Sequence, residues 1–169
     1  MQFEQGEHRG FYDLASDRWI KLTLPGRAGY VLDAEEEIPG VRGRLETRPA
    51  TPAEYLARLR LANEKFGDGI RFLGVIERSD GWSLVTSQPN VPGGPPSPRE
   101  IEQFFRANGF GQVNDRAWFR PADGLLVGDA HVANLKRTRK GDIVPFDLLL
   151  CEPRGALLRA VQPAVKLEF

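Results

Sequence analysis

VGDAHVANLKRTRKGDIVPFD, residues 127–147, is the stretch that carries most of the information about the fold of this chain. The apolar residues that lead into it predict a strand, and the polar loop that follows contains Asp129 and Asn134. A turn over 138–142, between two extended runs, predicts a β-hairpin. Such a hairpin would bring the carboxylate of Asp147 back beside the amide oxygen of Asn134.

These three side chains suit one kind of chemistry. A carboxylate and an amide oxygen on adjacent strand ends are hard ligands of the type that Mg²⁺ takes together with phosphate oxygens. Asp129, a second carboxylate nearby, would accept a proton from an attacking hydroxyl or orient it. Spacing alone leaves a second interpretation open, in which Asp129 and Asn134 are turn residues that satisfy loop backbone groups.

A helix is predicted upstream of this stretch from a capping box. Thr51 is the cap, Pro52 occupies the first helical position, and Glu54 completes the box. Gly67 ends the helix. The residues expected on its buried face are Tyr55, Leu59, Ala62 and Phe66.

A second helix is predicted between Ser97 and Asn108, with Glu100 completing its capping box. Its apolar face comprises Ile101, Phe104 and Phe105. Strands are expected in four further regions, residues 11–24 (as a strand pair), 70–77, 82–86 and 117–120, and a short helix over 156–161. This order of elements predicts an α+β fold.

The remaining segments are predicted to be irregular. Residues 38–52 and 90–98 are rich in proline and glycine and are expected to form surface loops. The acidic run 33–37 predicts a solvated loop or the start of a helix.

The composition narrows the class of protein. Lysine plus arginine equals aspartate plus glutamate at 23 each, so no overall field draws the chain to nucleic acid or membrane. The single cysteine excludes an internal disulfide and fits a reducing compartment. The sequence contains neither an apolar signal-peptide core nor a run of membrane-spanning length, and a cytoplasmic protein is expected.

At residues 127–135 the sequence resembles known phosphotransferases. VGDAHVANL is similar to the H-G-D-x-H-x-x-N loop of aminoglycoside and choline phosphotransferases, which have a protein-kinase-like fold. More closely, the chain from Glu7 to about Pro153 resembles the kinase domain of phage and bacterial polyvalent proteins. The matching segments are EHRGFYDLASDRWIKLT, EYLARLRLANEKFGD, LVTSQPNVPG, EIEQFFRANGF and VGDAHVANL with DIVPFD.

This resemblance implies a compact, truncated protein-kinase-like fold that binds ATP and Mg²⁺. One domain would span residues 1–169, with a strand-rich N-terminal lobe over about 1–88, a hinge over about 87–98 and a reduced C-terminal lobe over about 98–169. The activity implied is transfer of the γ-phosphoryl group to a hydroxyl acceptor.

The resemblance also implies roles for individual residues. Asp129 would be the catalytic aspartate, Asn134 and Asp147 the metal ligands, and Lys21 the lysine that holds the nucleotide phosphates. Two assignments concern the rest of the nucleotide site. Ser87 and Gln88 would bind adenine through the hinge backbone, and Glu54 would pair with the lysine.

Several positions depart from the family pattern. Val127 stands where the motif has histidine, PFDLL replaces DFG, and GEHRG at Gly6–Gly10 lacks the glycine-rich pattern. Only 22 residues follow Asp147, so the acceptor site would be minimal, supplied by a protein partner, or absent.

Other readings of these residues therefore stay open. The first is a catalytically inactive nucleotide-binding or interaction module, and the second is an unrelated α+β domain whose loop matches by chance. Lys21 would then be an exposed lysine on a half-buried strand, Glu54 only a capping residue, and the basic residues at 136–140 a solvated hairpin tip.

Overall fold

The computed structural model describes residues 2–35 and 44–162, with side chains from residue 6 onward. Its α-helices and antiparallel sheets confirm the predicted α+β class. The chain divides into two compact units, which are described in turn. The first comprises residues 1–31 and 49–91, and the second comprises residues 32–48 and 92–169.

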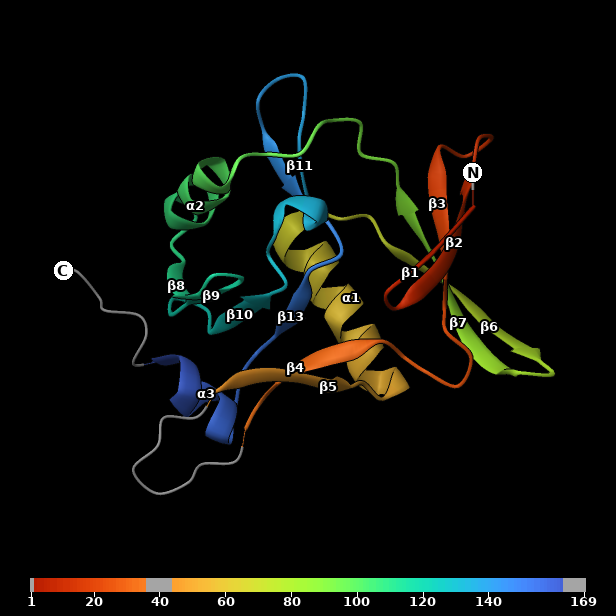
Figure 1. Cartoon of the computed structure of the whole chain (residues 1–169), viewed down its shortest axis with the longest axis horizontal. Coiled ribbons are helices and arrows are strands. Elements are labelled where there is room, and N and C mark those ends of the chain that lie inside the picture. Colours follow the sequence, from red (N-terminus) through yellow and green to blue (C-terminus); the bar gives the residue numbers. More distant parts are fainter. Residues whose placement is uncertain (1, 36–43, 163–169) are drawn as a thin grey trace. The chain divides into compact units, whose positions relative to one another are not determined.

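A five-stranded antiparallel sheet forms most of the first unit (Figure 1). In spatial order its strands are β1 (Gln2–Gln5), β2 (His8–Asp13), β3 (Arg18–Thr23), β7 (Gly81–Pro89) and β6 (Arg71–Arg78). The strand pair expected over 11–24 and the runs at 70–77 and 82–86 are therefore present. β3 and β7, far apart in the sequence, pair at the centre and fix the position of Lys21.

Helix α1 (Pro52–Phe66) belongs to the same unit and begins as predicted. The Thr51 hydroxyl accepts from the Glu54 amide, the Glu54 carboxylate accepts from the Thr51 amide, and Gly67 ends the helix with a φ of 69°. The predicted buried face was only half right. The buried residues are Tyr55, Arg58, Leu61 and Ala62, whereas Leu59 and Phe66 are partly exposed. The buried face is rotated because a charged residue, Arg58, lies inside it.

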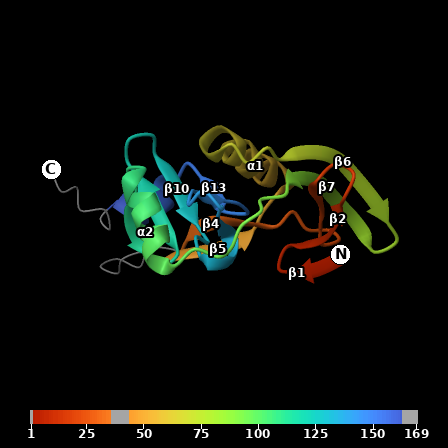
Figure 2. The same cartoon turned by 90° about the horizontal axis from the view of Figure 1, so that it is seen from above.

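The second unit is built on a four-stranded antiparallel sheet. In spatial order its strands are β13 (Leu149–Cys151), β10 (Leu125–Gly128), β9 (Ala117–Arg120) and β8 (Gly111–Asn114). Helix α2 (Pro98–Ala107) lies beside this sheet (Figure 2), where Phe105 stacks on Trp118 at a centroid distance of 5.0 Å. Its capping box at Ser97 and Glu100 is present as predicted.

One apolar core connects the sheet of this unit with helix α3 (Gly155–Val161). Its buried residues are Leu32, Phe119, Leu126, Leu149 and Val161. Cys151 packs against this core. Burial, reinforced by Asp33 and Glu152, raises the pKa of its thiol to about 12. The thiol is therefore protonated at neutral pH and a poor nucleophile, as expected of a core residue.

One predicted loop is in part a strand. Residues 45–49 form β5 (Leu45–Pro49), which pairs with β4 (Tyr30–Ala34), so the expectation of a continuous loop over 38–52 was wrong. Asp33 and Ala34, from the predicted acidic loop, likewise end β4. Residues 36–43 lie outside the described part of the chain. Proline is tolerated here because Pro49 ends the strand.

No helix among the described residues combines the length and the apolar character needed to cross a membrane.

Candidate functional site

Two strand ends bring Asp129 and Asp147 to the same edge of the second unit's sheet. β10 and β13 are antiparallel neighbours, and Gly128 lies opposite Leu149 in their register. Asp129 directly follows β10, and Asp147 lies two residues before β13 begins. Residues that follow one strand and precede its antiparallel partner share one end of the pair.

A second ladder brings Asn134 to the same place. The predicted hairpin consists of β11 (Leu135–Arg137) and β12 (Ile143–Pro145), with Leu135 opposite Pro145. At the end of the hairpin opposite its tip, the Phe146 amide donates a hydrogen bond to the Asn134 carbonyl at 2.9 Å. Asn134 therefore pairs with Phe146, and Asp147 is the next residue along the chain. A short 3-10 turn, η1 (Val132–Asn134), joins this hairpin to Asp129.

Asn134 and His131 each contact one oxygen of the Asp129 carboxylate. Asn134 donates its amide Nδ2 to Asp129 Oδ2 at 2.9 Å, and His131 Nε2 lies 3.2 Å from Asp129 Oδ1. His131 Nδ1 accepts from the Ala133 amide at 3.2 Å, which implies that the neutral ring carries its proton on Nε2. The carboxylate is thus oriented, yet its side chain is 40% exposed and accessible to a reactant.

The backbone at both aspartates is unusual. Asp129 has a φ of 55° and Asp147 a φ of 57°, and Asp17 is the only other non-glycine residue with positive φ in the described part of the chain. This left-handed region is uncommon for residues with a Cβ, although aspartate tolerates it better than most. Such conformations gather at functional sites. Two of the three here fall on residues singled out from the sequence.

Gly128, the residue before Asp129, is required by packing. A Cβ at this position would lie 2.5 Å from Leu32 Cδ2, and Leu32 is itself buried in the core of the second unit. Sequence reasoning quoted this glycine in the motif without assigning it a role. Its contact with β4 is distant in sequence and leaves no local signal.

The side-chain oxygens of Asn134 and Asp147 suit a metal ion that takes its remaining ligands from a bound substrate and from water. Groups of three or more His, Cys, Asp or Glu side chains that could hold a metal do not occur among the described residues. Asn134 and Asp147 would supply two oxygens, and Mg²⁺ commonly takes one or two protein ligands, with phosphate and water completing the octahedron. The Asn134 nitrogen is engaged by Asp129, which leaves its Oδ1 as the atom suited to a cation.

The other predicted site residues lie in the first unit. Lys21 is in β3, opposite Gly10 of β2 and Thr86 of β7. Ser87 pairs with β3 and β6, and its carbonyl accepts from the Arg18 guanidinium at 3.0 Å. Gln88 lies one residue past the last pair with β6 and pairs with β3 alone. Of the two predicted hinge residues, Gln88 is therefore the one that pairs with a neighbouring strand on one side only.

Glu54 is held by the helix cap. Its carboxylate accepts from the Thr51 amide at 2.8 Å and from the Thr51 hydroxyl at 2.9 Å. The buried ion pair of α1 is formed instead by Arg58, whose guanidinium donates to Glu7 at 2.8 and 3.1 Å and to the Tyr30 carbonyl at 3.1 Å. This pairing ties α1 to the turn between β1 and β2.

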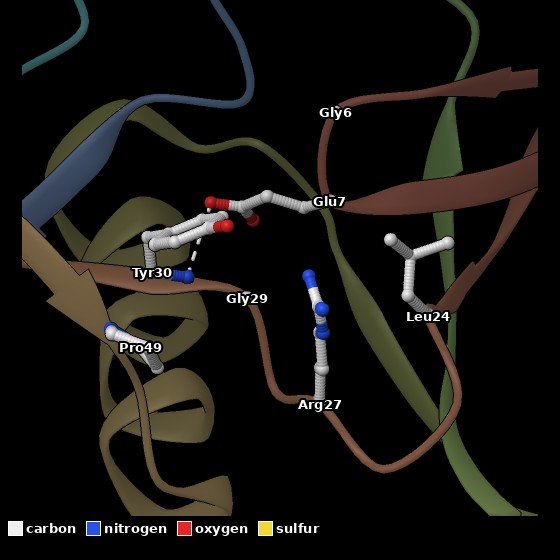
Figure 3. Close-up of a pocket in the computed structure, with 7 residues that line it drawn as sticks. All are labelled: Gly6, Glu7, Leu24, Arg27, Gly29, Tyr30 and Pro49. Atoms are coloured by element: carbon white, nitrogen blue, oxygen red, sulfur yellow. Dashed lines mark hydrogen bonds between the residues drawn. The ribbon is translucent and has the colours of Figure 1, made fainter.

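Figure 3 shows Glu7 at a cavity of about 340 Å³ in the first unit, with its bond to the Tyr30 amide and with Arg27 extending toward the same space. Arg58 also lies over the Tyr55 ring, 5.0 Å from its centroid, and the Tyr55 hydroxyl bonds to His8 at 2.9 Å. Sequence reasoning missed this network. Its one local signal was Arg58 between Tyr55 and Ala62 on the buried face.

The structure thus brings Asp129, Asn134 and Asp147 together in the second unit, while Lys21, Glu54, Ser87 and Gln88 belong to the first. A family model described as a serine/threonine/tyrosine kinase found in polyvalent proteins matches residues 43–150, more than half of the chain. Comparisons with curated proteins and with solved structures find no significant match.

Proposed function

Since the chain belongs to the family of serine/threonine/tyrosine kinases found in polyvalent proteins, we propose that it binds ATP with Mg²⁺ and phosphorylates a side-chain hydroxyl of a polypeptide. The observation that supports this most directly is the convergence of Asp129, Asn134 and Asp147 through two independent ladders. Three oxygen-bearing side chains at one edge match what phosphoryl transfer requires, namely a proton acceptor beside a phosphate-bound metal.

Asp129 is proposed to receive the proton of the acceptor hydroxyl. Its carboxylate is held by Asn134 and His131, so it would not have to reorient as the hydroxyl attacks. Such positioning is the main source of rate enhancement in phosphoryl transfer, where little covalent chemistry falls to the protein. His131 is a positioning residue in this scheme, since it acts through Asp129.

Asn134 Oδ1 and the Asp147 carboxylate are proposed to hold Mg²⁺ against the nucleotide phosphates. When bound, the ion would neutralise charge on the transferred group. Lys21 is proposed to contact the phosphates, and the backbone from Gln88 onward to contact the base. In this scheme residues 1–88 form the N-terminal lobe, apart from residues 32–48, which belong to the second unit. Residues 87–98 form the hinge and residues 98–169 a reduced C-terminal lobe.

Calorimetry and a phosphotransfer assay test this proposal. Wild type should bind ATP more tightly with Mg²⁺ than without, and Asp147→Asn should remove that difference. Asp129→Asn should retain nucleotide binding but lose about 10²- to 10⁴-fold in turnover, the usual contribution of a general base. Asp115→Asn, at an exposed turn, is the matched control and should behave as wild type. Undiminished turnover by Asp129→Asn would refute the catalytic role.

One observation favours a second candidate, a nucleotide-binding module without turnover. The turn expected to cradle phosphates carries the Glu7 carboxylate, which is committed to Arg58, and lacks the glycine-rich pattern. A negative charge at that turn does not favour phosphate binding. ATP binding without phosphotransfer to any peptide would select this candidate.

A further inference from the structure

A surface groove lies beside the candidate site in the second unit. It is lined by residues 92–94 and by the hairpin tip at residues 137–141, and its volume is about 660 Å³. We call it the hairpin groove. Gly94 and Arg137 exchange backbone hydrogen bonds of 3.1 and 2.8 Å across it. A Cβ on Gly93 would lie 2.4 Å from the Arg137 carbonyl oxygen, so this close approach of two backbones requires glycine.

The hairpin groove is positively charged. Residues 136–140 read KRTRK, four cations in five positions of a chain whose net charge is zero. Lys136 lies over the Phe146 ring at 5.6 Å, and Arg137 pairs with Glu100 at 3.2 Å.

The other two cations are placed to meet a ligand. Arg139 and Lys140 are exposed at the tip, and no ion pair to either is found in the described part of the chain. Asp142 is the acidic residue of the same tip, where its amide donates to the Thr138 hydroxyl. The tip therefore keeps an excess of positive charge, which suits an anionic partner.

The register of the hairpin sets the distance from this charge to the proposed chemistry. Asn134 and Phe146 pair at the open end, and Thr138 and Asp142 pair at the tip. β11 lies between them, and the four residue steps from Asn134 to Thr138, at about 3.3 Å each, separate the two ends by roughly 13 Å. An extended peptide covers that distance in about four residues.

We propose that the hairpin groove binds acidic side chains of the polypeptide substrate, about four positions from the acceptor hydroxyl, through Arg139 and Lys140. This inference rests on the proposed function and names its substrate class. A single-stranded nucleic acid fits the groove less well, because none of the lining residues is aromatic and such strands bind in part by stacking their bases on aromatic side chains.

Two matched peptides test the inference. One carries Glu four positions to either side of a single Ser, and the other carries Gln there. Wild type should prefer the acidic peptide by about 3- to 10-fold in kcat/KM at low salt, the range expected for two exposed charge pairs. In the double variant R139A/K140A the ratio should fall to about one. Arg78→Ala, which removes one exposed charge from the first unit, should keep the wild-type ratio.

The outcomes separate this inference from the proposed function. Turnover of both peptides at equal rates by wild type would overturn the inference and leave the kinase activity standing. If no peptide is phosphorylated, the proposed function fails. In that case, fluorescence anisotropy with the labelled acidic peptide tests the hairpin groove separately. Peptide binding that is lost in R139A/K140A supports the inference, and absence of peptide binding to wild type overturns it. Stronger binding of a single-stranded oligonucleotide than of the acidic peptide would also overturn it.

Discussion

Gly128 sets how closely β10 packs against Leu32 at the point where the chain enters Asp129. Replacement by alanine would place a Cβ 2.5 Å from Leu32 Cδ2 in a buried layer, so one of the two must move. Overpacking of this kind costs about 1–3 kcal/mol. We expect Gly128→Ala to lower the free energy of unfolding by that amount, as measured by urea denaturation.

A second glycine provides the control for this substitution. Gly94 has no atom within 4 Å of an added Cβ, so Gly94→Ala should change stability by less than about 0.5 kcal/mol. Equal stability of Gly128→Ala and wild type would mean that Leu32 adjusts freely, and that the glycine has no packing role.

The pair formed by Glu7 and Arg58 joins α1 to the turn between β1 and β2. The Arg58 side chain is 3% exposed and that of Glu7 is 17% exposed. Removal of one partner from such a pair leaves a poorly solvated charge and costs about 3–5 kcal/mol, toward the lower end here because Glu7 retains some solvent contact. We expect Arg58→Met to cause this loss, as measured by urea denaturation.

An exposed pair on the same helix provides the comparison. Arg60 and Glu64 form an i,i+4 pair with side chains 61% and 48% exposed, and Arg60→Met should cost less than about 0.5 kcal/mol. The double variant Glu7→Gln with Arg58→Met should recover part of the loss, because the unpaired carboxylate is then absent. A single variant as stable as Arg60→Met would contradict the role given to the buried pair.

Elements whose ends are marked by their own residues were predictable, and elements defined by distant partners were not. The capping boxes at Thr51 and Ser97 located both long helices, because the cap hydrogen bonds join residues three positions apart. β5 was missed because its pairing with β4 spans residues that proline and glycine mark as a loop. The place of Arg58 in the buried face was hidden too, since its partner Glu7 is 51 residues away.

At the scale of the whole molecule, the division into two units predicts where each variant acts. Arg58 and Glu7 lie in the first unit, and Gly128 and Leu32 in the second. How readily a segment unfolds locally depends on how well that segment is packed. In hydrogen exchange with peptide resolution, Arg58→Met should therefore lose protection chiefly in α1 and the sheet formed with β7. Gly128→Ala should lose it chiefly in β10 and its neighbours. Equal losses in both units for both variants would contradict this prediction.

The same scale explains which part of the candidate site could be predicted. Asp129, Asn134 and Asp147 fall within 19 consecutive residues, and the hairpin brings Asp147 back toward Asn134, so this part of their proximity could be read from local patterns. The left-handed backbone at both aspartates and the contact of Gly128 with Leu32 depend on packing across the second unit. Neither has a counterpart in spacing or composition.

The two strand pairings that bring Asp129, Asn134 and Asp147 to one edge of the sheet also determine how the gene can change. β10 with β13 and β11 with β12 each hold a fixed register, and a one-residue slip turns every side chain of a strand to the opposite face. Insertions or deletions inside these strands would therefore separate the oxygen-bearing side chains. Residues 139–141 at the tip lie outside both ladders, so lineages could lengthen, shorten or recharge this turn. Substrate preference could then diverge between descendants while the chemistry is inherited unaltered.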